Sequence, residues 1–370
     1  MLKAYKYRLI PNKEQREMIN KHIGGCRFVY NWALETKIKY YQEANQKLSA
    51  YDLNYMLTEL KNENEWLKDV YSQSLQQANK NMESAFTKFF REKAGFPKFK
   101  SKKNPVQSFQ IPQHYKVNFD KNIIKLPKIG EIKAVLHRAF EGKLKTATVS
   151  RTSTGKYFIS ILVEDGKEVP EKSKFTELNT IGVDVGIKDF AVLSNGEKID
   201  NPKYLKKSLK RLKVVQKQVS KKVKGSNNRK KAIKRLAKIH EKVTNQRTDF
   251  QHKVSARLIR ENQAIAFETL KVKNMVKNHC LAQAINDASW SSFIIKMEYK
   301  AEWYGKTILR IGQFELSTKL CNVCGYHNKD ITLEIREWVC LECKTKHDRD
   351  INAAINIKKF ALQDQNLIVI

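Results

Sequence analysis

The segment NTIGVDVGIKDFAVLSNGEKI, residues 179–199, decides the fold of the region that surrounds it. The apolar residues before Asp184 predict a buried strand, Val185-Gly186 predicts a turn, and the following residues predict a second strand that ends at Ser-Asn-Gly. A carboxylate at the end of a buried strand is costly unless it is hydrogen-bonded or binds something. Because Gly186 leaves room for a backbone or a phosphate to approach, Asp184 is the first candidate site residue.

Two further acids occupy comparable places in the sequence. Glu268 ends the apolar run Ala264-Ile265-Ala266-Phe267, and Asp350 begins the alanine-rich helix DINAAINI. Singly, each acid has an ordinary explanation as a turn former or a helix cap. Converging carboxylates, however, bind Mg²⁺, and two such ions about 4 Å apart support phosphodiester hydrolysis. We therefore predict that Asp184, Glu268 and Asp350 converge as catalytic Mg²⁺ ligands, and we interpret Asp348 as a helix-entry residue.

Four of the six cysteines form two pairs with metal-ligand spacing. Cys321 and Cys324 are separated from Cys340 and Cys343 by 15 residues, which is within the range of a zinc ribbon. Four thiolates form a closed tetrahedral site, so one Zn²⁺ would be structural. The ion would supply much of the folding free energy of so short a segment. The alternative interpretation, a redox motif, is disfavoured because redox chemistry needs only one CxxC pair.

The remaining cysteines and the nearby histidines lack such a pattern. We expect Cys26 and Cys280 to be packed or exposed thiols without partners. We expect His327 and His347 to be surplus to the metal site, on the surface or facing nucleic acid.

The most unusual feature of the composition is its excess of positive charge. The 71 Lys and Arg residues against 38 Asp and Glu leave a formal net charge of +33, and nucleic acid is the usual partner of such a surface. The alternatives to a nucleic-acid-binding protein are a protein with a solvated basic surface and a protein bound to anionic lipid. No apolar run reaches the length of a membrane span and no signal sequence is seen, so we expect a cytoplasmic, reducing environment and no membrane partner.

The chain before residue 179 predicts two kinds of structure. A strand ends at Pro11, and a capping box of Asn12 and Gln15 then opens a helical segment that extends to about residue 95, with breaks at Gly24-Gly25 and 62–64. The segment GFPKFKSKKNP (95–105) excludes a helix and interleaves lysines with aromatic residues. Short alternating runs follow and predict a small β-rich unit, which the N-terminal strand completes as a barrel.

Residues 203–243 predict a strongly basic helical hairpin. The segment contains 17 Lys and Arg residues and one acid, Glu241, with two narrow apolar stripes joined at GSNN (225–228). A solvated helix pair would carry more acids to offset its bases. A long helix, the strand that ends at Glu268, more helix and a strand beginning at Thr307 complete the expected order.

These motifs together resemble one family over nearly the whole chain. IGVDVGIKDFAV, the strand ending in Glu268, LAQAINDASWSSFIIKMEYKAEWYGK, the double CxxC and DRDINAAINI are similar to the RuvC core of TnpB proteins, which are the OrfB proteins of insertion sequences. KYRLIPNKEQ, CRFVYNWALE and GFPKFKSKKN also resemble that family, which is related to the compact type V CRISPR effectors. One departure is Lys344, which stands where the family often has glycine.

The resemblance implies an α/β multidomain architecture. It implies an RNase H-like (RuvC) nuclease domain with an inserted zinc ribbon, an N-terminal helical recognition subdomain and a small β-barrel (wedge) domain. The expected segments are 1–11 with 96–178 (wedge), 12–95 (recognition), 179–316 (nuclease, with the hairpin 203–243), 317–347 (ribbon) and 348–370 (nuclease C-terminal segment).

The resemblance also implies an RNA-guided DNA endonuclease that cleaves next to a short duplex motif. Its partners would be a guide RNA from the element, double-stranded target DNA and the displaced strand, with no obligate protein partner, in a prokaryotic, nucleoid-associated setting. Asp184, Glu268 and Asp350 match the family's three catalytic acids one by one. The residues expected at nucleic-acid contacts are Tyr51, Gln76, Phe96, Lys98, Phe99, Lys100, Lys206, Lys207, Lys210 and Arg211.

Two other functions stay open at this point. One is an RNA-guided DNA-binding regulator that has lost cleavage, which predicts a missing or displaced acid. The other is a transposase that cuts and rejoins element ends, because a fold alone does not exclude that chemistry.

Overall fold

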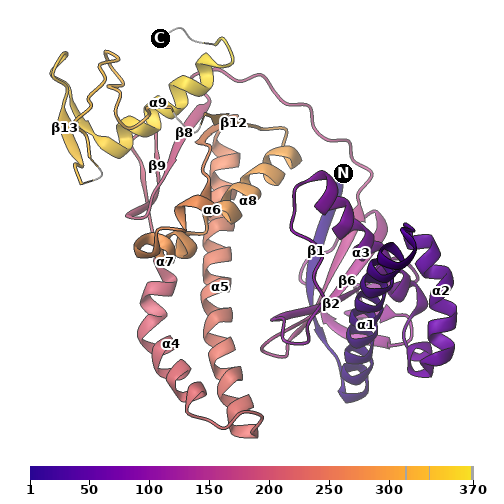
Figure 1. Cartoon of the computed structure of the whole chain (residues 1–370). Coiled ribbons are helices and arrows are strands. Elements are labelled where there is room, and N and C mark those ends of the chain that lie inside the picture. The colour runs from indigo at the N-terminus through magenta and orange to yellow at the C-terminus, as the bar shows by residue number, and fades with distance from the viewer. Residues whose placement is uncertain (313–314, 333, 368–370) are drawn as a thin grey trace. The chain divides into compact units, whose positions relative to one another are not determined.

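The computed structural model describes residues 1–312, 315–332 and 334–367, and its chain divides into two compact units, Met1–Lys167 and Glu168–Ile370. Residues 313–314 of the expected nuclease segment, 333 of the ribbon and 368–370 of the C-terminal segment lie outside the described residues. Figure 1 shows the elements of both units along the chain. Within the described part, no helix has both the length and the apolar character that crossing a membrane requires.

The first unit contains a seven-stranded sheet in the order β2-β6-β7-β1-β5-β4-β3. The N-terminal strand β1 (Leu2–Ile10) pairs antiparallel with β7 and β5, so it lies inside the sheet as predicted. The edge strands are β2 and β3, and no pairing joins them among the described residues, so closure into a barrel stays a prediction. The other strands are β2 (Val106–Ile111), β3 (Lys116–Asn118), β4 (Ile123–Leu126), β5 (Gly130–Val135), β6 (Lys143–Thr152) and β7 (Tyr157–Glu164).

Helices cover this sheet and share one apolar core with it. They are α1 (Lys13–Ala44), α2 (Ala50–Glu63), the 3₁₀ helix η1 (Glu65–Asp69) and α3 (Ser72–Arg91). The capping box is confirmed, because Asn12 and Gln15 exchange hydrogen bonds of 2.8 and 3.0 Å. The break predicted at Gly24-Gly25 is wrong, because α1 continues through both residues. Gly25 instead makes room for a packed neighbour: a Cβ at this position would lie 2.9 Å from the Val70 side chain.

The second unit is built on a mixed five-stranded sheet in the order β10-β9-β8-β11-β12. Strands β8, β11 and β12 are parallel, whereas β9 and β10 pair antiparallel. Their bounds are β8 (Thr180–Val185), β9 (Asp189–Leu193), β10 (Lys198–Asp200), β11 (Ala264–Glu268) and β12 (Thr307–Ile311). The strand–turn–strand predicted for residues 179–199 is therefore confirmed.

The sheet's two faces have different side chains. One face presents large residues such as Val183, Ile265 and Phe267 to α5 (Asn227–Glu261) and α8 (Trp290–Trp303). The other face presents small ones, including Gly182 and Ala266, to α9 (Arg349–Gln363). A Cβ on Gly182 would lie 2.1 Å from the Ala354 carbonyl oxygen. Glycine at this position therefore lets α9 contact the strand backbone directly.

The basic hairpin predicted for residues 203–243 is formed by α4 (Tyr204–Ser220) and the first part of α5, which lie side by side (Figure 1). The separate long helix expected after residue 243 was wrong, because α5 continues to Glu261. The N-cap of α4, Lys203, makes no side-chain capping bond. Instead, the buried carboxylate of Asp287 accepts hydrogen bonds from the backbone N–H groups of Leu205 and Lys206 and pairs with Arg247. Asp287 belongs to α7 (His279–Ala288), which follows the short α6 (Val272–Met275). It therefore caps and anchors the hairpin from a distant part of the sequence.

The unit boundary differs from the expected one. Residues 168–178 belong to the second unit, where Ser173 donates its N–H to the Gly305 carbonyl and a Cβ on Gly305 would lie 2.6 Å from the Glu171 carbonyl. The segment expected to complete the first unit after β7 therefore packs against the second.

Gly182→Ala tests the contact between β8 and α9. Because the new methyl group has no space, we expect a loss of about 2 kcal/mol of stability, typical of overpacking, measured as a lower melting temperature of the second unit. Gly24→Ala is the matched control: nothing lies within 4 Å of its Cβ position, so it should stabilise helix α1 by about 1 kcal/mol. Equal melting temperatures for wild type and Gly182→Ala would contradict the close contact.

Candidate metal centres and nucleic-acid surface

Two of the three predicted acids lie at one level of the sheet. Val183 and Phe267 are register partners on the parallel strands β8 and β11, so Asp184 and Glu268 follow them at the same carboxyl edge. Neighbouring strands are about 4.8 Å apart. Both acids point to the face on which Gly182 receives α9, because side chains two residues apart share a face.

The third acid comes from α9, whose N-cap is Asp348. Asp348 accepts hydrogen bonds from the backbone N–H groups of Asp350 and Ile351, which confirms it as a helix-entry residue. Asp350 lies one turn before Ala354, the residue that touches Gly182. The Gly182 contact therefore brings Asp350 to the end of β8 that carries Asp184.

The charges of the other two acids influence Asp184. Burial, and after it the charges of Asp350 and Glu268, raise the pKa of Asp184 to about 8, while Arg349 opposes the shift. Burial also raises the pKa of Glu268, against a hydrogen bond that Ser317 donates at 3.1 Å. A half-buried cluster of like charges is stabilised by protons or cations, so this donor set fits Mg²⁺.

Arginines provide part of that positive charge in this structure. Arg349 and Arg336 donate to the two oxygens of Asp350 at 2.7 and 3.2 Å. Among the described residues, the three carboxylates do not gather as closely as the four cysteines, whose sulfurs all lie within 4.8 Å of one another. Joint coordination of one ion by all three carboxylates would therefore require at least one of these side chains to move.

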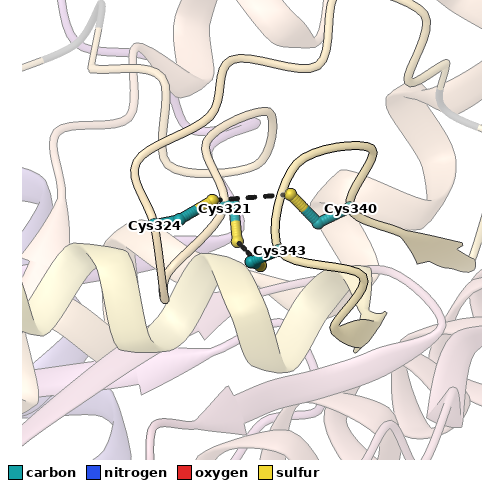
Figure 2. Close-up of side chains that lie close together, drawn as sticks. All are labelled: Cys321, Cys324, Cys340 and Cys343. Atoms are coloured by element: carbon teal, nitrogen blue, oxygen red, sulfur yellow. Dashed lines mark hydrogen bonds between the residues drawn. The ribbon is translucent and has the colours of Figure 1, made fainter.

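The four cysteines predicted to bind zinc lie together (Figure 2). The Sγ atoms of Cys324 and Cys340 are 3.5 Å apart, and those of Cys321 and Cys343 are 3.6 Å apart. Tetrahedral Zn–S bonds of 2.3 Å imply S–S separations of about 3.8 Å, so the sulfurs fit Zn²⁺. The second pair follows β13 (Glu337–Val339) and precedes β14 (Lys346–Asp348), which form a two-stranded sheet. Lys344 has φ 60°, a left-handed conformation that explains why glycine suits this position.

The expectation that His347 lies on the surface or faces nucleic acid was wrong. This residue is buried, its Nε2 lies 3.1 Å from Cys321 Sγ, and its ring packs on Trp338. A ribbon this small has few apolar residues, so the imidazole serves as core and as a neighbour of the thiolate. Cys26 is buried and Cys280 exposed, as expected of unpaired thiols.

A cavity of about 760 Å³ lies beside the acids. Asp184 and Asp350 line it together with Lys188, Lys203 and Lys206. Glu268 is not among its lining residues. The cavity therefore has acidic groups that suit a metal ion and ammonium groups that suit a phosphate backbone.

The predicted nucleic-acid contacts have different surroundings. Most are exposed side chains on α2, α3, α4 or the 95–105 segment: Tyr51, Gln76, Lys98, Phe99, Lys206, Lys207, Lys210 and Arg211. Phe96 is half exposed and packs edge-on against Phe86 and Phe89. The ammonium of Lys100 lies over the Tyr30 ring, 3.9 Å from its centre. Lys100 is therefore engaged within the protein, and Phe96 is partly so.

Sequence reasoning missed three residues that touch the acids. Ser317 donates to Glu268, and Arg336 and Arg349 pair with Asp350. Arg349 had a usable signal, because it stands between Asp348 and Asp350. Ser317 and Arg336 had none, because only the folded ribbon brings them to the acids.

Comparison with solved structures defines the class of fold. The chain matches a Cas12f1–sgRNA–target DNA complex with a TM-score of 0.59 at 15% identity, covering 97% of this chain and 98% of that one. It also matches the mini-RNA-guided endonuclease CRISPR-Cas phi3 with a TM-score of 0.50 at 10% identity, covering 98% and 92%. The protein therefore has the mixed α/β fold of the compact CRISPR effectors.

Sequence relatives then give the family. A Streptomyces pristinaespiralis protein named "Putative RNA-guided DNA endonuclease" is 38% identical over 96% of this chain and 88% of its own length. The similarly named InsQ of Escherichia coli K12 is 32% identical over 96% and 91%. Family models described as "Probable transposase", "Cas12f1-like, TNB domain" and "Helix-turn-helix domain" match residues 160–279, 290–357 and 1–47. The chain belongs to the TnpB (OrfB) family of insertion-sequence proteins.

Cys340→Ser tests the zinc assignment. Loss of one buried thiolate should remove the bound zinc and expose residues 317–348 to protease, because the metal supplies much of the folding free energy. Elemental analysis and limited proteolysis measure both effects. Cys280→Ser, at an exposed thiol outside the cluster, should keep one zinc ion per chain; equal zinc contents in the two variants would refute the assignment.

The raised pKa of Asp184 predicts how stability changes with pH. The folded protein holds a proton with a pKa of about 8, whereas the ordinary value is 3.8, so stability is lost as pH rises through this range. Without added divalent ions, wild type should lose about 1 kcal/mol per pH unit between about pH 6 and pH 8 relative to Asp184→Asn. Denaturant unfolding at several pH values measures this, and parallel pH profiles would contradict it.

Proposed function

We propose that the protein is an RNA-guided, Mg²⁺-dependent DNA endonuclease with an RNase H-like (RuvC) nuclease domain. The observation that carries this proposal is the placement of Asp184 and Glu268 at one edge of the sheet, against which the helix that carries Asp350 packs. Burial, and after it the charges of Asp350 and Glu268, raise the pKa of Asp184. Three acids from separate elements at one edge of a sheet form the oxygen-rich site that two-metal hydrolysis of phosphodiesters uses. The relatives' names support the same activity.

The distribution of charge supports a nucleic-acid substrate. The hairpin residues Lys206, Lys207, Lys210 and Arg211 are exposed on α4, and Lys206 also lines the cavity that Asp184 and Asp350 share. A basic surface that leads to a carboxylate cluster holds the phosphate backbone of a strand while the metal site acts on one phosphodiester. Guide pairing supplies the sequence specificity, and the protein reads duplex shape and the adjacent motif.

Each metal has a separate function in this proposal. Asp184, Glu268 and Asp350 would hold Mg²⁺, which would supply the activation of water and the stabilisation of the leaving oxygen. Zn²⁺, bound by the four cysteines, is structural because no coordination position stays open. The chain's own groups orient the acids: Ser317 holds Glu268 and the α9 N-terminus holds Asp350.

Substitution of each acid tests the proposal. Asp184→Asn, Glu268→Gln and Asp350→Asn, purified with co-expressed RNA, should each lower Mg²⁺-dependent cleavage of a matching plasmid at least about 100-fold. Target binding should persist, because the basic surfaces are unchanged. Asp200→Asn, an exposed acid on β10, should cleave like wild type.

The same experiment distinguishes the two other functions. Target binding without cleavage by wild type would indicate an RNA-guided regulator, and joining of strands would indicate a transposase. Target-dependent cleavage that survives in all three acid variants would overturn the assignment of the site.

A further inference from the structure

Two buried asparagines on α9 hold the entry to the zinc ribbon. The side chains of Asn352 and Asn356 are each 1% exposed. Asn352 donates to the Leu320 carbonyl at 2.8 Å and accepts from the Asn322 N–H at 2.9 Å. Asn356 donates to the carbonyls of Ser317 and Leu320 at 2.8 and 2.7 Å. The backbone on both sides of Cys321 is thus fixed to the helix that carries Asp350.

The same backbone segment reaches the other acids. Ser317, 2% exposed, uses its carbonyl for Asn356 and its hydroxyl for Glu268. Arg336, which lies later in the ribbon, pairs with Asp350 through its guanidinium group. The backbone carbonyl of Arg336 also accepts a hydrogen bond from the Arg349 N–H at 2.8 Å. Ribbon residues therefore contact two of the three acids directly.

We propose that the cysteine cluster and the acid cluster are one coupled metal-binding unit, in which Asn356 and Ser317 are positioning residues for Glu268. Zinc binding fixes the backbone from 317 to 322; this backbone, held by Asn356, fixes the Ser317 hydroxyl that orients Glu268. The inference rests on the proposed function only in that the acids bind a divalent ion.

Asparagine suits this position for a physical reason. An apolar residue at 356 would leave two buried carbonyls, those of Ser317 and Leu320, without one of their donors, at a cost in free energy. Groups that orient metal ligands through hydrogen bonds typically alter metal affinity 10–100-fold when removed. Coupling of two sites is also reciprocal, so Mg²⁺ at the acids must strengthen zinc binding by the same factor by which zinc strengthens Mg²⁺ binding.

Mn²⁺ is the probe for the acid cluster, because its paramagnetism reports binding without cleavage. In zinc-loaded, nucleic-acid-free protein, Asn356→Ala should weaken Mn²⁺ binding about 10-fold. Asn79→Ala is the matched control: Asn79 is 0% exposed and donates to Asn54 at 2.8 Å, but it lies in the first unit. This variant should lose stability and keep the Mn²⁺ affinity of wild type.

Zinc competition with a chromophoric chelator tests the reciprocal effect. Mg²⁺ should increase zinc affinity in wild type and in Asn79→Ala but much less in Asn356→Ala. If Asn356→Ala does not fold, Ser317→Ala, which removes only the hydroxyl bond to Glu268, should show the same loss of Mn²⁺ affinity while it retains zinc.

The outcomes separate this inference from the proposed function. Wild-type Mn²⁺ affinity in Asn356→Ala and Ser317→Ala, together with zinc affinity that is independent of Mg²⁺, would overturn the coupling and leave the nuclease proposal intact. A wild-type protein that binds no Mn²⁺ and does not cleave would overturn both.

Discussion

The direct contact between Gly182 and α9 is the constraint on which the candidate site depends. With a Cβ position only 2.1 Å from the Ala354 carbonyl oxygen, β8 accepts no side chain there. The helix therefore lies on the strand backbone, supported by the small residues Ala264 and Ala266 on the neighbouring strand. Asp184 is two residues after Gly182, and Asp350 is four residues before Ala354. The close contact between α9 and β8 therefore places Asp350 and Asp184 at the same end of the strand.

This arrangement concentrates negative charge at half-buried positions beside a cavity. The large apolar residues on the opposite face of the sheet make the core that holds β8 and β11 in register, and that register places Glu268 beside Asp184. Packing therefore forces together groups that repel each other. The cost is reduced by the raised pKa of Asp184 and by the two arginines at Asp350, because protons and guanidinium groups neutralise part of the cluster.

Local sequence patterns predicted the elements well, since these depend on nearby residues. The strand pair of residues 179–199, the capping box at Asn12 and the cysteine spacing each carry their own physical reason. Tertiary packing decided the rest. Gly24-Gly25 resembles a helix break, but Gly25 makes room for Val70, and His347 resembles a surface residue, but it fills the ribbon core.

For the site, the sequence predicted the cysteine cluster that the structure brings together and proposed the three acids, but it did not predict the residues that support them. Carboxylates at strand ends and paired CxxC motifs are recognisable because their chemistry restricts residue type and spacing. Ser317 and Arg336 have no such signature, since a serine or arginine acquires its function only from what the fold places beside it. The two asparagines of α9 are part of the motif DINAAINI, but the alanine and isoleucine residues of that motif predicted only an apolar packing face. The hydrogen bonds that these asparagines make to the ribbon were not predicted.

The location of the ribbon in the chain has a physical consequence. Because the cysteine pairs are inserted between β12 and α9, the polypeptide must enter and leave the ribbon beside the acids that these elements position. A small domain with little core is a poor anchor unless a metal makes it rigid. Once rigid, it can hold Ser317 and Arg336 at fixed positions against Glu268 and Asp350. In the coupling proposed above, the thiolate cluster contributes to the acid cluster through geometry, although thiolates and carboxylates have different ligand chemistry.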